Sequence, residues 1–453
     1  MTLSAIPLFI GLLVMLTVKE PKTRKKLDET KKAFSSQSAM RLRALSKKSI
    51  KEAEVSEEKA REIPIVKIVD TLLEYGYQNK ASDIHIEPRE DKIEVRFRID
   101  GVLHDVVDLP KFVLDPVVTR IKILARLRTD EHRAAQDGKI HKKLSGEDID
   151  IRVSIMPITD GEKVVMRILS VRGRGFSLED LGLLEKDVKT VETNFKKPFG
   201  MILATGPTGS GKTTTLYAIL KKLNTRRVNI STIEDPIEYD MEGINQIQVD
   251  PRTNLTFAEG LKSIMRQDPD IIMVGEIRDD ETASIAVNAA MTGHLVLSSL
   301  HTNDAATTLP RLLDMGIEPY LVASTVNVAI AQRLVRKICM RCIESYTVKG
   351  KELEKIKQRI DLNKIMGKEV KEIRCYKGKG CQTCHQSGYS GRVGIFEVLE
   401  MEDSIRDLIM QKANSDQIKE QAVKNGMTTM IEDGVNKALM GITTIDEILR
   451  VIQ

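Results

Sequence analysis

The stretch that most constrains this chain reads Gly-Pro-Thr-Gly-Ser-Gly-Lys-Thr, at residues 206–213. An apolar run at 201–204 before it predicts a buried strand, and the pattern at 214–220 after it predicts a helix. The octet matches G-x-x-x-x-G-K-S/T, in which glycines let backbone N–H groups surround phosphates at a helix N-terminus. We therefore expect the chain to bind a nucleoside triphosphate through Gly206, Pro207, Thr208, Gly209, Ser210, Gly211, Lys212 and Thr213. Lys212 would reach the β- and γ-phosphates, and the Thr213 hydroxyl would bind Mg²⁺.

Charge is unevenly distributed along the 453 residues, a length that predicts more than one domain. Between Lys19 and Lys51 there are twelve Lys or Arg and three Asp or Glu, a local charge of +9. Because the whole chain carries +5, the remainder carries −4. A body that is not basic, with 4% aromatic residues, argues against a nucleic-acid-binding protein that stacks bases.

The first eighteen residues contain no charged side chain, and basic residues follow at 19–26. About 17–25 apolar residues span a bilayer as a helix, so residues 3–18 predict a membrane anchor. By the positive-inside rule the rest of the chain would lie at the cytoplasmic face of the plasma (inner) membrane. Two alternatives stay open, namely a hydrophobic helix docked on a partner and a mis-assigned start codon.

Composition and hydrophobic periodicity divide the chain into five parts. We expect an apolar segment at 1–18, a basic linker at 19–61, a smaller α+β domain at 62–172, a hinge at 173–177 and an ATPase domain at 178–453. In the smaller domain, helical spacing at 65–73 is followed by strand-like alternation at 84–86 and 93–99. In the ATPase domain, predicted strands alternate with helices, which indicates an α/β fold.

Acidic residues and histidines follow three predicted strands of the ATPase domain. Glu234, Asp235 and Glu238 follow the strand at 229–233, and Glu276 follows the strand at 271–274. A third strand, at 295–297, leads to His301. Beside a phosphate-binding loop, strand ends are where an ATPase places its Mg²⁺ ligands and the groups that orient water.

Four cysteines form two C-x-x-C pairs, Cys339 with Cys342 and Cys381 with Cys384. Four thiolates complete the tetrahedral coordination of a structural Zn²⁺ ion. The interval between the pairs is longer than in a standard zinc ribbon, and Cys375 and His385 are spare candidate ligands. We expect a zinc-binding segment at 339–384.

Nine motifs occur together in an order that resembles one family, the GspE/PilB-type ATPases of type II secretion and type IV pilus assembly. They lie at 81–88, 98–101, 136–138, 206–213, 233–238, 266–270, 274–279, 292–294 and 300–302, and the resemblance covers about residues 62–453. It implies an α/β fold with a RecA-like P-loop ATPase domain. A smaller α+β (PAS-like) domain would precede this domain, and a zinc-binding insertion and a helical end would follow.

The resemblance also implies roles for individual residues. Glu276 is similar to the Walker B glutamate that polarises water, and Glu238 to an acidic-box glutamate near Mg²⁺, with Glu234 and Asp235 beside it. His294 and His301 resemble a histidine-box pair, the second near the γ-phosphate.

Three basic residues carry further implied roles. Arg152 and Arg167 match arginines that the smaller domain is thought to present to a neighbouring subunit's nucleotide. Arg266 matches another basic position of the family pattern. One turn earlier, where members often carry Arg, this chain has Lys262, which cannot form a bidentate fork.

The implied function is a Mg²⁺-dependent, hexameric ATPase that drives assembly of pilin-like subunits, with ATP, Mg²⁺ and Zn²⁺ bound. Its implied partners are further copies of the chain, a polytopic inner-membrane platform protein and, indirectly, pilin-like subunits, with no specific nucleic acid. A pilus-retraction ATPase is the nearest alternative, although that family lacks the zinc-binding insertion. Less favoured are a zinc- and nucleic-acid-binding P-loop protein and a catalytically silent subunit. Where many secretion ATPases have an N-terminal docking domain, we expect the apolar segment and the basic linker instead.

Overall fold

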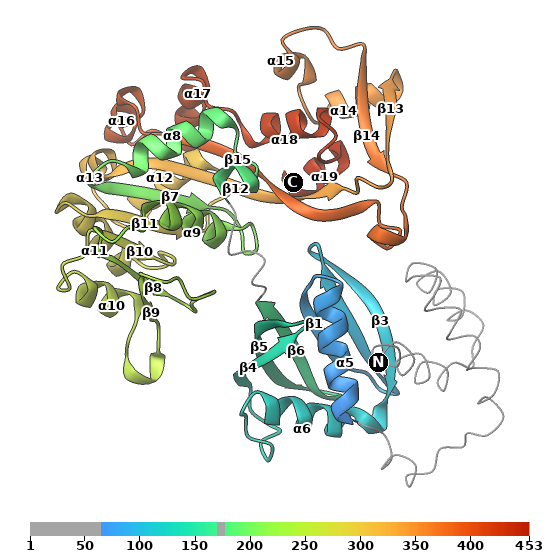
Figure 1. Ribbon diagram of the computed structural model, residues 1–453. Helices are drawn as coiled ribbons and strands as arrows, with labels where there is room; N and C mark the ends of the chain where they lie inside the picture. Colours follow the sequence, from blue (N-terminus) through green and yellow to red (C-terminus); the bar gives the residue numbers. More distant parts are fainter. Residues whose placement is uncertain (1–64, 170–176, 453) are drawn as a thin grey trace. The chain divides into compact units, whose positions relative to one another are not determined.

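In the computed structural model the described residues are 65–169 and 177–452, and they form two units (Figure 1). Of these residues, one unit comprises 65–169 together with Lys379–Gly388, and the other comprises 177–378 and 389–452. The predicted apolar segment and basic linker lie outside the described residues, as does most of the predicted hinge. No helix among residues 65–169 and 177–452 is both long enough and apolar enough to cross a membrane.

The first unit is an antiparallel sheet with two helices, as the alternating pattern of the sequence predicts. Its elements are α5 (Ile65–Gln78), β1 (Ala81–Pro88), β2 (Lys92–Ile99), β3 (Val102–Pro110), α6 (Leu114–Leu124), β4 (Gln136–Leu144), β5 (Glu147–Ile158) and β6 (Gly161–Leu169). The strand order is β3-β2-β1-β6-β5-β4. Alternate residues of β2, such as Ile93, Val95 and Phe97, are buried in a core shared with both helices. The α+β expectation is therefore confirmed.

The second unit is built on a seven-stranded sheet. Its first part contains α7 (Leu178–Leu181), α8 (Glu185–Phe195), β7 (Gly200–Thr205), α9 (Lys212–Leu223), β8 (Ile230–Glu234), β9 (Asn245–Gln248), α10 (Phe257–Ile264), β10 (Ile271–Val274), α11 (Asp280–Met291), β11 (Leu295–Leu300), α12 (Ala305–Asp314) and α13 (Pro319–Thr325). The order is β15-β12-β7-β11-β10-β8-β9, and only β15 runs antiparallel to its neighbour. Strands alternate with helices, as predicted.

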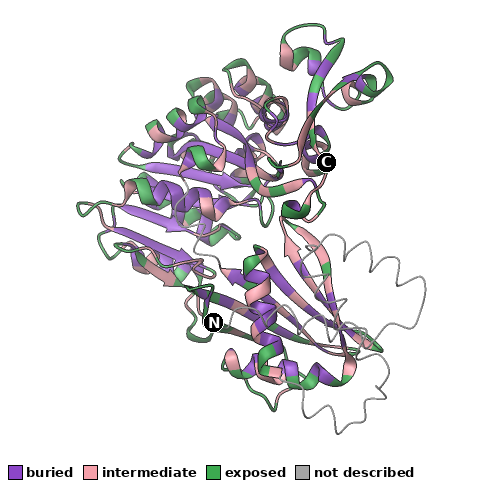
Figure 2. Ribbon diagram, turned by 45° about the vertical axis from the view of Figure 1, so that its right-hand side comes forward, coloured by how far each residue is buried: buried purple, intermediate pink, exposed green. Residues whose placement is uncertain are grey.

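Every residue of β7 is buried, because helices cover both faces of the sheet (Figure 2). Met201 and Leu203 enter one apolar cluster, while Ile202 and Ala204 enter the other. This explains why the strand before the phosphate-binding loop reads as a continuous apolar run. Close packing on both faces of β7 sets the position at which the loop that follows it begins.

The second half of this unit contains two long paired strands, a smaller sheet and a helical end. The elements are β12 (Val326–Ile338), β13 (Ile343–Lys349), α14 (Lys351–Lys357), α15 (Leu362–Met366), β14 (Glu372–Gly378), β15 (Tyr389–Glu400), α16 (Asp403–Met410), α17 (Ser415–Lys424), α18 (Met430–Leu439) and α19 (Ile445–Ile452). Strands β13 and β14 pair with each other. A separate apolar cluster joins this small sheet to α18 and α19, for example through Val348, Ile373 and Val435.

Candidate functional site

The phosphate-binding loop connects β7 to α9, as the sequence predicts. Gly206, Gly209 and Gly211 have φ of 144°, 79° and 94°, values that glycine adopts readily and other residues rarely do. Lys212 begins α9 and is 9% exposed, with its Nζ donating to the Gly206 carbonyl at 2.8 Å. Burial lowers the pKa of Lys212, and the nearby charge of Glu276 opposes that shift. The backbone of the loop therefore surrounds the Lys212 ammonium group.

Two observations fit this loop to a phosphate chain. The Ser210 side chain is 3% exposed, and its hydroxyl has no hydrogen-bond partner among the described residues. A Cβ on Gly206 would lie 2.5 Å from the Gln332 carbonyl oxygen, so a side chain there would not fit. A helix N-terminus with an unsatisfied hydroxyl and an enclosed cation is suited to bind an anion.

Glu276 lies two residues beyond the end of β10, at the same edge of the sheet as the loop. His301, which follows β11, approaches it with Nε2 at 3.0 Å from Oε2, and Arg278 forms an ion pair with the other oxygen. Burial raises the pKa of Glu276, but the hydrogen bonds from Arg278 and His301 outweigh that effect and lower it. The structure therefore brings the Glu276 carboxyl group, Arg278 and His301 together at one place.

Glu234 ends β8 and has different surroundings. It is 3% exposed, and its carboxyl group accepts hydrogen bonds from Thr232 Oγ1 at 2.6 Å and Gln246 Nε2 at 3.2 Å. The Tyr217 hydroxyl also bonds to it. Burial raises the pKa of Glu234, and these neutral donors only partly oppose the shift. Both oxygens are thus engaged in a buried hydrogen-bond network.

The other two acidic residues after β8 are more accessible. Asp235 is exposed and lies 3.7 Å from Arg278, the same arginine that pairs with Glu276. Glu238 is half-buried in the loop between β8 and β9. Asp235 is therefore linked to Glu276 through a shared cation.

Two predicted site residues do not lie beside the loop within this unit. His294 precedes β11 while His301 follows it, so the six-residue strand separates them. His294 Nδ1 contacts the Ala289 carbonyl oxygen at 2.9 Å, at the end of α11. Arg266 is exposed after α10 and donates to the Lys262 carbonyl oxygen at 3.0 Å. The structure does not group these two side chains with Lys212.

Arg152 and Arg167 are paired across neighbouring strands of the first unit, on β5 and β6. Arg167 is exposed, and its Nε lies 2.9 Å from Asp83 Oδ1. Asp83 is 5% exposed and also lies 3.6 Å from Arg98. The buried carboxylate of Asp83 thus pairs with the Nε of Arg167.

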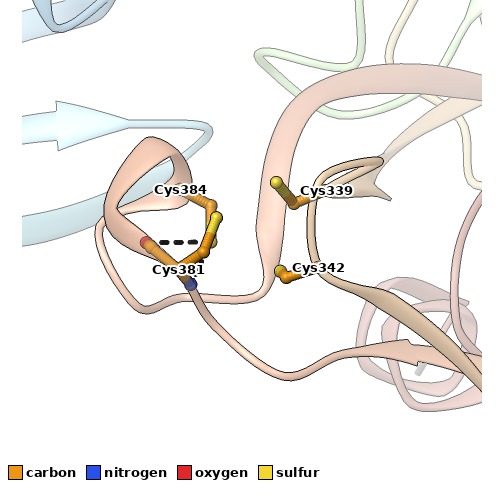
Figure 3. A group of neighbouring side chains, drawn as sticks. All are labelled: Cys339, Cys342, Cys381 and Cys384. Carbon is orange, nitrogen blue, oxygen red and sulfur yellow. Dashed lines mark hydrogen bonds between the residues drawn. The ribbon is translucent and has the colours of Figure 1, made fainter.

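The four cysteines of the two C-x-x-C pairs come together (Figure 3). The sulfur atoms of Cys339, Cys342, Cys381 and Cys384 lie within 4.8 Å of one another, a spacing compatible with four ligands around one Zn²⁺ ion. Cys375, a spare candidate, is not in this group. It is buried in the apolar cluster with α18 and α19, and burial raises its pKa to about 11.

Sequence reasoning missed two residues on β12. Gln332 is 1% exposed, and its amide bonds to the Ser210 carbonyl at 2.9 Å and to Thr215 Oγ1 at 2.7 Å. Arg333 donates to Asn303 Oδ1 at 3.3 Å. The signal for them was a polar pair that interrupts the apolar pattern of residues 328–335.

Comparison with known proteins gives the family. Residues 58–450 match the family model of the Type II/IV secretion system protein. The chain is 47% identical over 394 residues to the type II secretion system protein E of Xanthomonas campestris pv. campestris. The aligned residues cover 87% of this chain and 68% of that protein. It is 45% identical over 389 residues to the type IV pilus assembly ATPase TfpB of Acinetobacter baylyi, with 86% and 65% covered.

Solved structures show the same fold. The Legionella pneumophila ATPase DotB has a TM-score of 0.62 at 22% identity, covering 84% of this chain and 94% of that one. The pilus retraction motor PilT with bound ADP has a TM-score of 0.58 at 24% identity, with 84% and 96% covered. The RecA-like fold is thereby confirmed. With the family model spanning most of its length, this chain belongs to the type II/IV secretion system protein family.

Proposed function

We propose that this chain hydrolyses ATP in the presence of Mg²⁺ and so drives assembly of pilin or pseudopilin fibres. The observation that supports it best is the grouping of Lys212, Glu276 and His301 at one edge of the sheet. Glu276 would orient the attacking water, and Lys212 would neutralise the β- and γ-phosphates. Thr213 and the acidic residues Asp235 and Glu238 would hold the Mg²⁺, which supplies charge neutralisation when bound.

The arginines of the smaller domain would act between subunits. Arg152 and Arg167 lie on strands of the first unit, and Arg167 is exposed while Asp83 holds its Nε. An arginine supplied by a neighbouring subunit stabilises charge in phosphoryl transfer and couples hydrolysis to subunit movement. We therefore propose a homo-oligomer, a hexamer, that works on a membrane platform protein at the cytoplasmic face of the inner membrane.

The metal would be structural. Four thiolates would surround one Zn²⁺ ion and leave no coordination position open. Cys339 follows β12 directly, and β15 begins a few residues after Cys384. A bound Zn²⁺ would therefore fix the far ends of two strands that pair along most of their length.

The names of the relatives favour a fibre-assembly motor over a retraction motor. Those that match at 43–47% identity are named as type II secretion proteins or pilus assembly ATPases, whereas the retraction motor PilT matches at 24% identity. Loss of an assembly motor removes surface fibres, whereas loss of a retraction motor leaves them in place. Fibre counts by electron microscopy in a strain that lacks this gene separate the two functions.

Phosphate release by the purified full chain tests the ATPase proposal. Lys212→Ala should abolish Mg²⁺-dependent hydrolysis because the cation on the β- and γ-phosphates is lost. Lys221→Ala is the matched control, since Lys221 is an exposed lysine on the same helix, α9. Equal rates for the Lys212→Ala variant and the parent chain would contradict the proposal.

A further inference from the structure

Strand β12 extends past the end of β7, and its continuation lies beside the phosphate-binding loop. The two strands are parallel, with Ala331 opposite Thr205, the last residue of β7. The next residues of β12, Gln332 and Arg333, therefore lie beside the start of the loop. The close approach of the Gln332 carbonyl oxygen to Gly206 shows the same contact.

Gln332 fixes β12 to the loop and to the helix after it. Its Nε2 donates to the Ser210 carbonyl oxygen at 2.9 Å, and its Oε1 accepts from Thr215 Oγ1 at 2.7 Å. Both ends of a buried amide are thus satisfied by groups of the nucleotide-binding segment. The residue that follows Gln332 is held in register with the loop.

Arg333 lies between the loop and the segment that carries His301. Its guanidinium donates to Asn303 Oδ1, and Asn303 is two residues beyond His301, which contacts Glu276. None of the ion pairs within residues 65–169 and 177–452 involves Arg333, and the nearby Asp304 pairs with Lys419 instead. Burial lowers the pKa of Arg333. Burial also lowers the pKa of Lys212, and the positive charge of Arg333 lowers it further. Glu276 and Asp304 act on these two cations from a distance, but neither Lys212 nor Arg333 forms a direct ion pair within the part of the chain that is described.

We propose that Arg333 binds the terminal phosphate of ATP in the same chain as Lys212, with Gln332 as its positioning residue. This inference rests on the proposed ATP hydrolysis and adds a substrate-binding residue to it. A guanidinium is always protonated and can bind two phosphate oxygens at once, which suits a partly buried place beside the γ-phosphate. It differs from Arg152 and Arg167, because it comes from β12 of the nucleotide-binding unit itself.

The test compares ATP and ADP binding by full-length variants, with fluorescent mant-ATP and mant-ADP as the probes. Arg333→Ala should weaken mant-ATP binding about tenfold or more, the loss expected for a charge-assisted hydrogen bond. Binding of mant-ADP, which lacks the terminal phosphate, should change much less. Arg333→Lys should recover part of the mant-ATP affinity because the charge returns without the fork.

Lys337→Ala is the matched control, since Lys337 is an exposed cation four residues along the same strand. Its mant-ATP affinity should equal that of the parent chain. If Arg333→Ala proves unstable in thermal unfolding, Arg333→Gln replaces it, because the amide keeps a hydrogen-bonding group near Asn303.

Two results would overturn the inference. One is unchanged mant-ATP affinity in both neutral variants of Arg333. The other is an equal loss for mant-ATP and mant-ADP, which would mean that Arg333 supports the loop rather than the terminal phosphate. If the parent chain itself binds neither probe, the ATPase proposal fails as well, so the two failures are distinguishable.

Discussion

Two glutamates follow neighbouring parallel strands, yet their surroundings are opposite. Glu234, at the end of β8, is buried among the neutral donors Thr232, Tyr217 and Gln246. Glu276, beyond the end of β10, contacts the cation Arg278 and His301. Burial raises the pKa of Glu234, whereas for Glu276 the charged partners outweigh burial and lower the pKa. A strand end places a carboxyl group at the site, but its neighbours decide in which direction its pKa shifts.

The comparison gives different expectations for the same substitution at the two positions. Glu276→Gln should reduce ATP hydrolysis about 10²–10⁴-fold, because the charge that orients water is lost. Nucleotide binding should persist, since the phosphate-binding loop is unchanged. Glu234→Gln should change the rate by less than about threefold, because a neutral amide can keep hydrogen bonds to the uncharged partners Thr232, Tyr217 and Gln246. Steady-state phosphate release measures both variants.

The opposite ranking would reverse the comparison. If Glu234→Gln stopped turnover and Glu276→Gln did not, the buried glutamate would be the catalytic group. Equal losses in both variants would show that the acidic residues after β8 and β10 work as one unit.

The cysteine group extends the comparison to residues for which we propose a structural role. Cys381→Ser combined with Cys384→Ser should remove one Zn²⁺ per chain and lower the Tm by about 5 °C or more, because two ligands are lost. Cys375→Ala is the matched control. This variant should keep its zinc, because Cys375 lies in a separate apolar cluster. Metal analysis by mass spectrometry gives the zinc content. Zinc retained without the two C-x-x-C thiols would contradict the assignment.

Charged groups on a strand face, rather than at a strand end, provide a further contrast. Arg152 and Arg167 face each other across β5 and β6 in the first unit. If they act on a neighbouring subunit, mixing Arg152→Ala chains with Lys212→Ala chains should restore part of the hydrolysis, with a maximum near equal amounts. Each variant alone should be inactive. Mixed oligomers that show no recovery at any ratio would argue against this role.

The smallest expected effect is the pH dependence of stability. Because the folded-state pKa of Glu234 is raised, this residue favours the folded state below its ordinary pKa of 4.5, and that contribution is lost as the pH rises through the folded value. Glu234→Gln should therefore raise the unfolding free energy at pH 8 and leave it unchanged near pH 4. Urea unfolding at the two pH values measures this. A gain of equal size at both would show that ionisation of Glu234 is not the cause.

Local patterns predicted a large part of the fold. The apolar run before Gly206 forms β7 and the segment after it forms α9, because a buried parallel strand and a phosphate-binding helix each have a local pattern. The spacing of the two C-x-x-C pairs likewise predicted a four-cysteine group. The roles of individual residues at the site stay predictions until the variants are measured.

What the sequence determined by itself was the order of strands and helices, the phosphate-binding loop and the cysteines, since periodicity and ligand spacing are local properties. Tertiary structure alone decided which polar side chains meet. His294 and His301 are seven residues apart in sequence, but an extended strand of six residues places them at opposite edges of the sheet. Gln332 and Arg333 are more than a hundred residues from the loop, yet pairing of β12 with β7 brings them beside it. Proximity across a sheet depends on strand order and register, which no local pattern specifies.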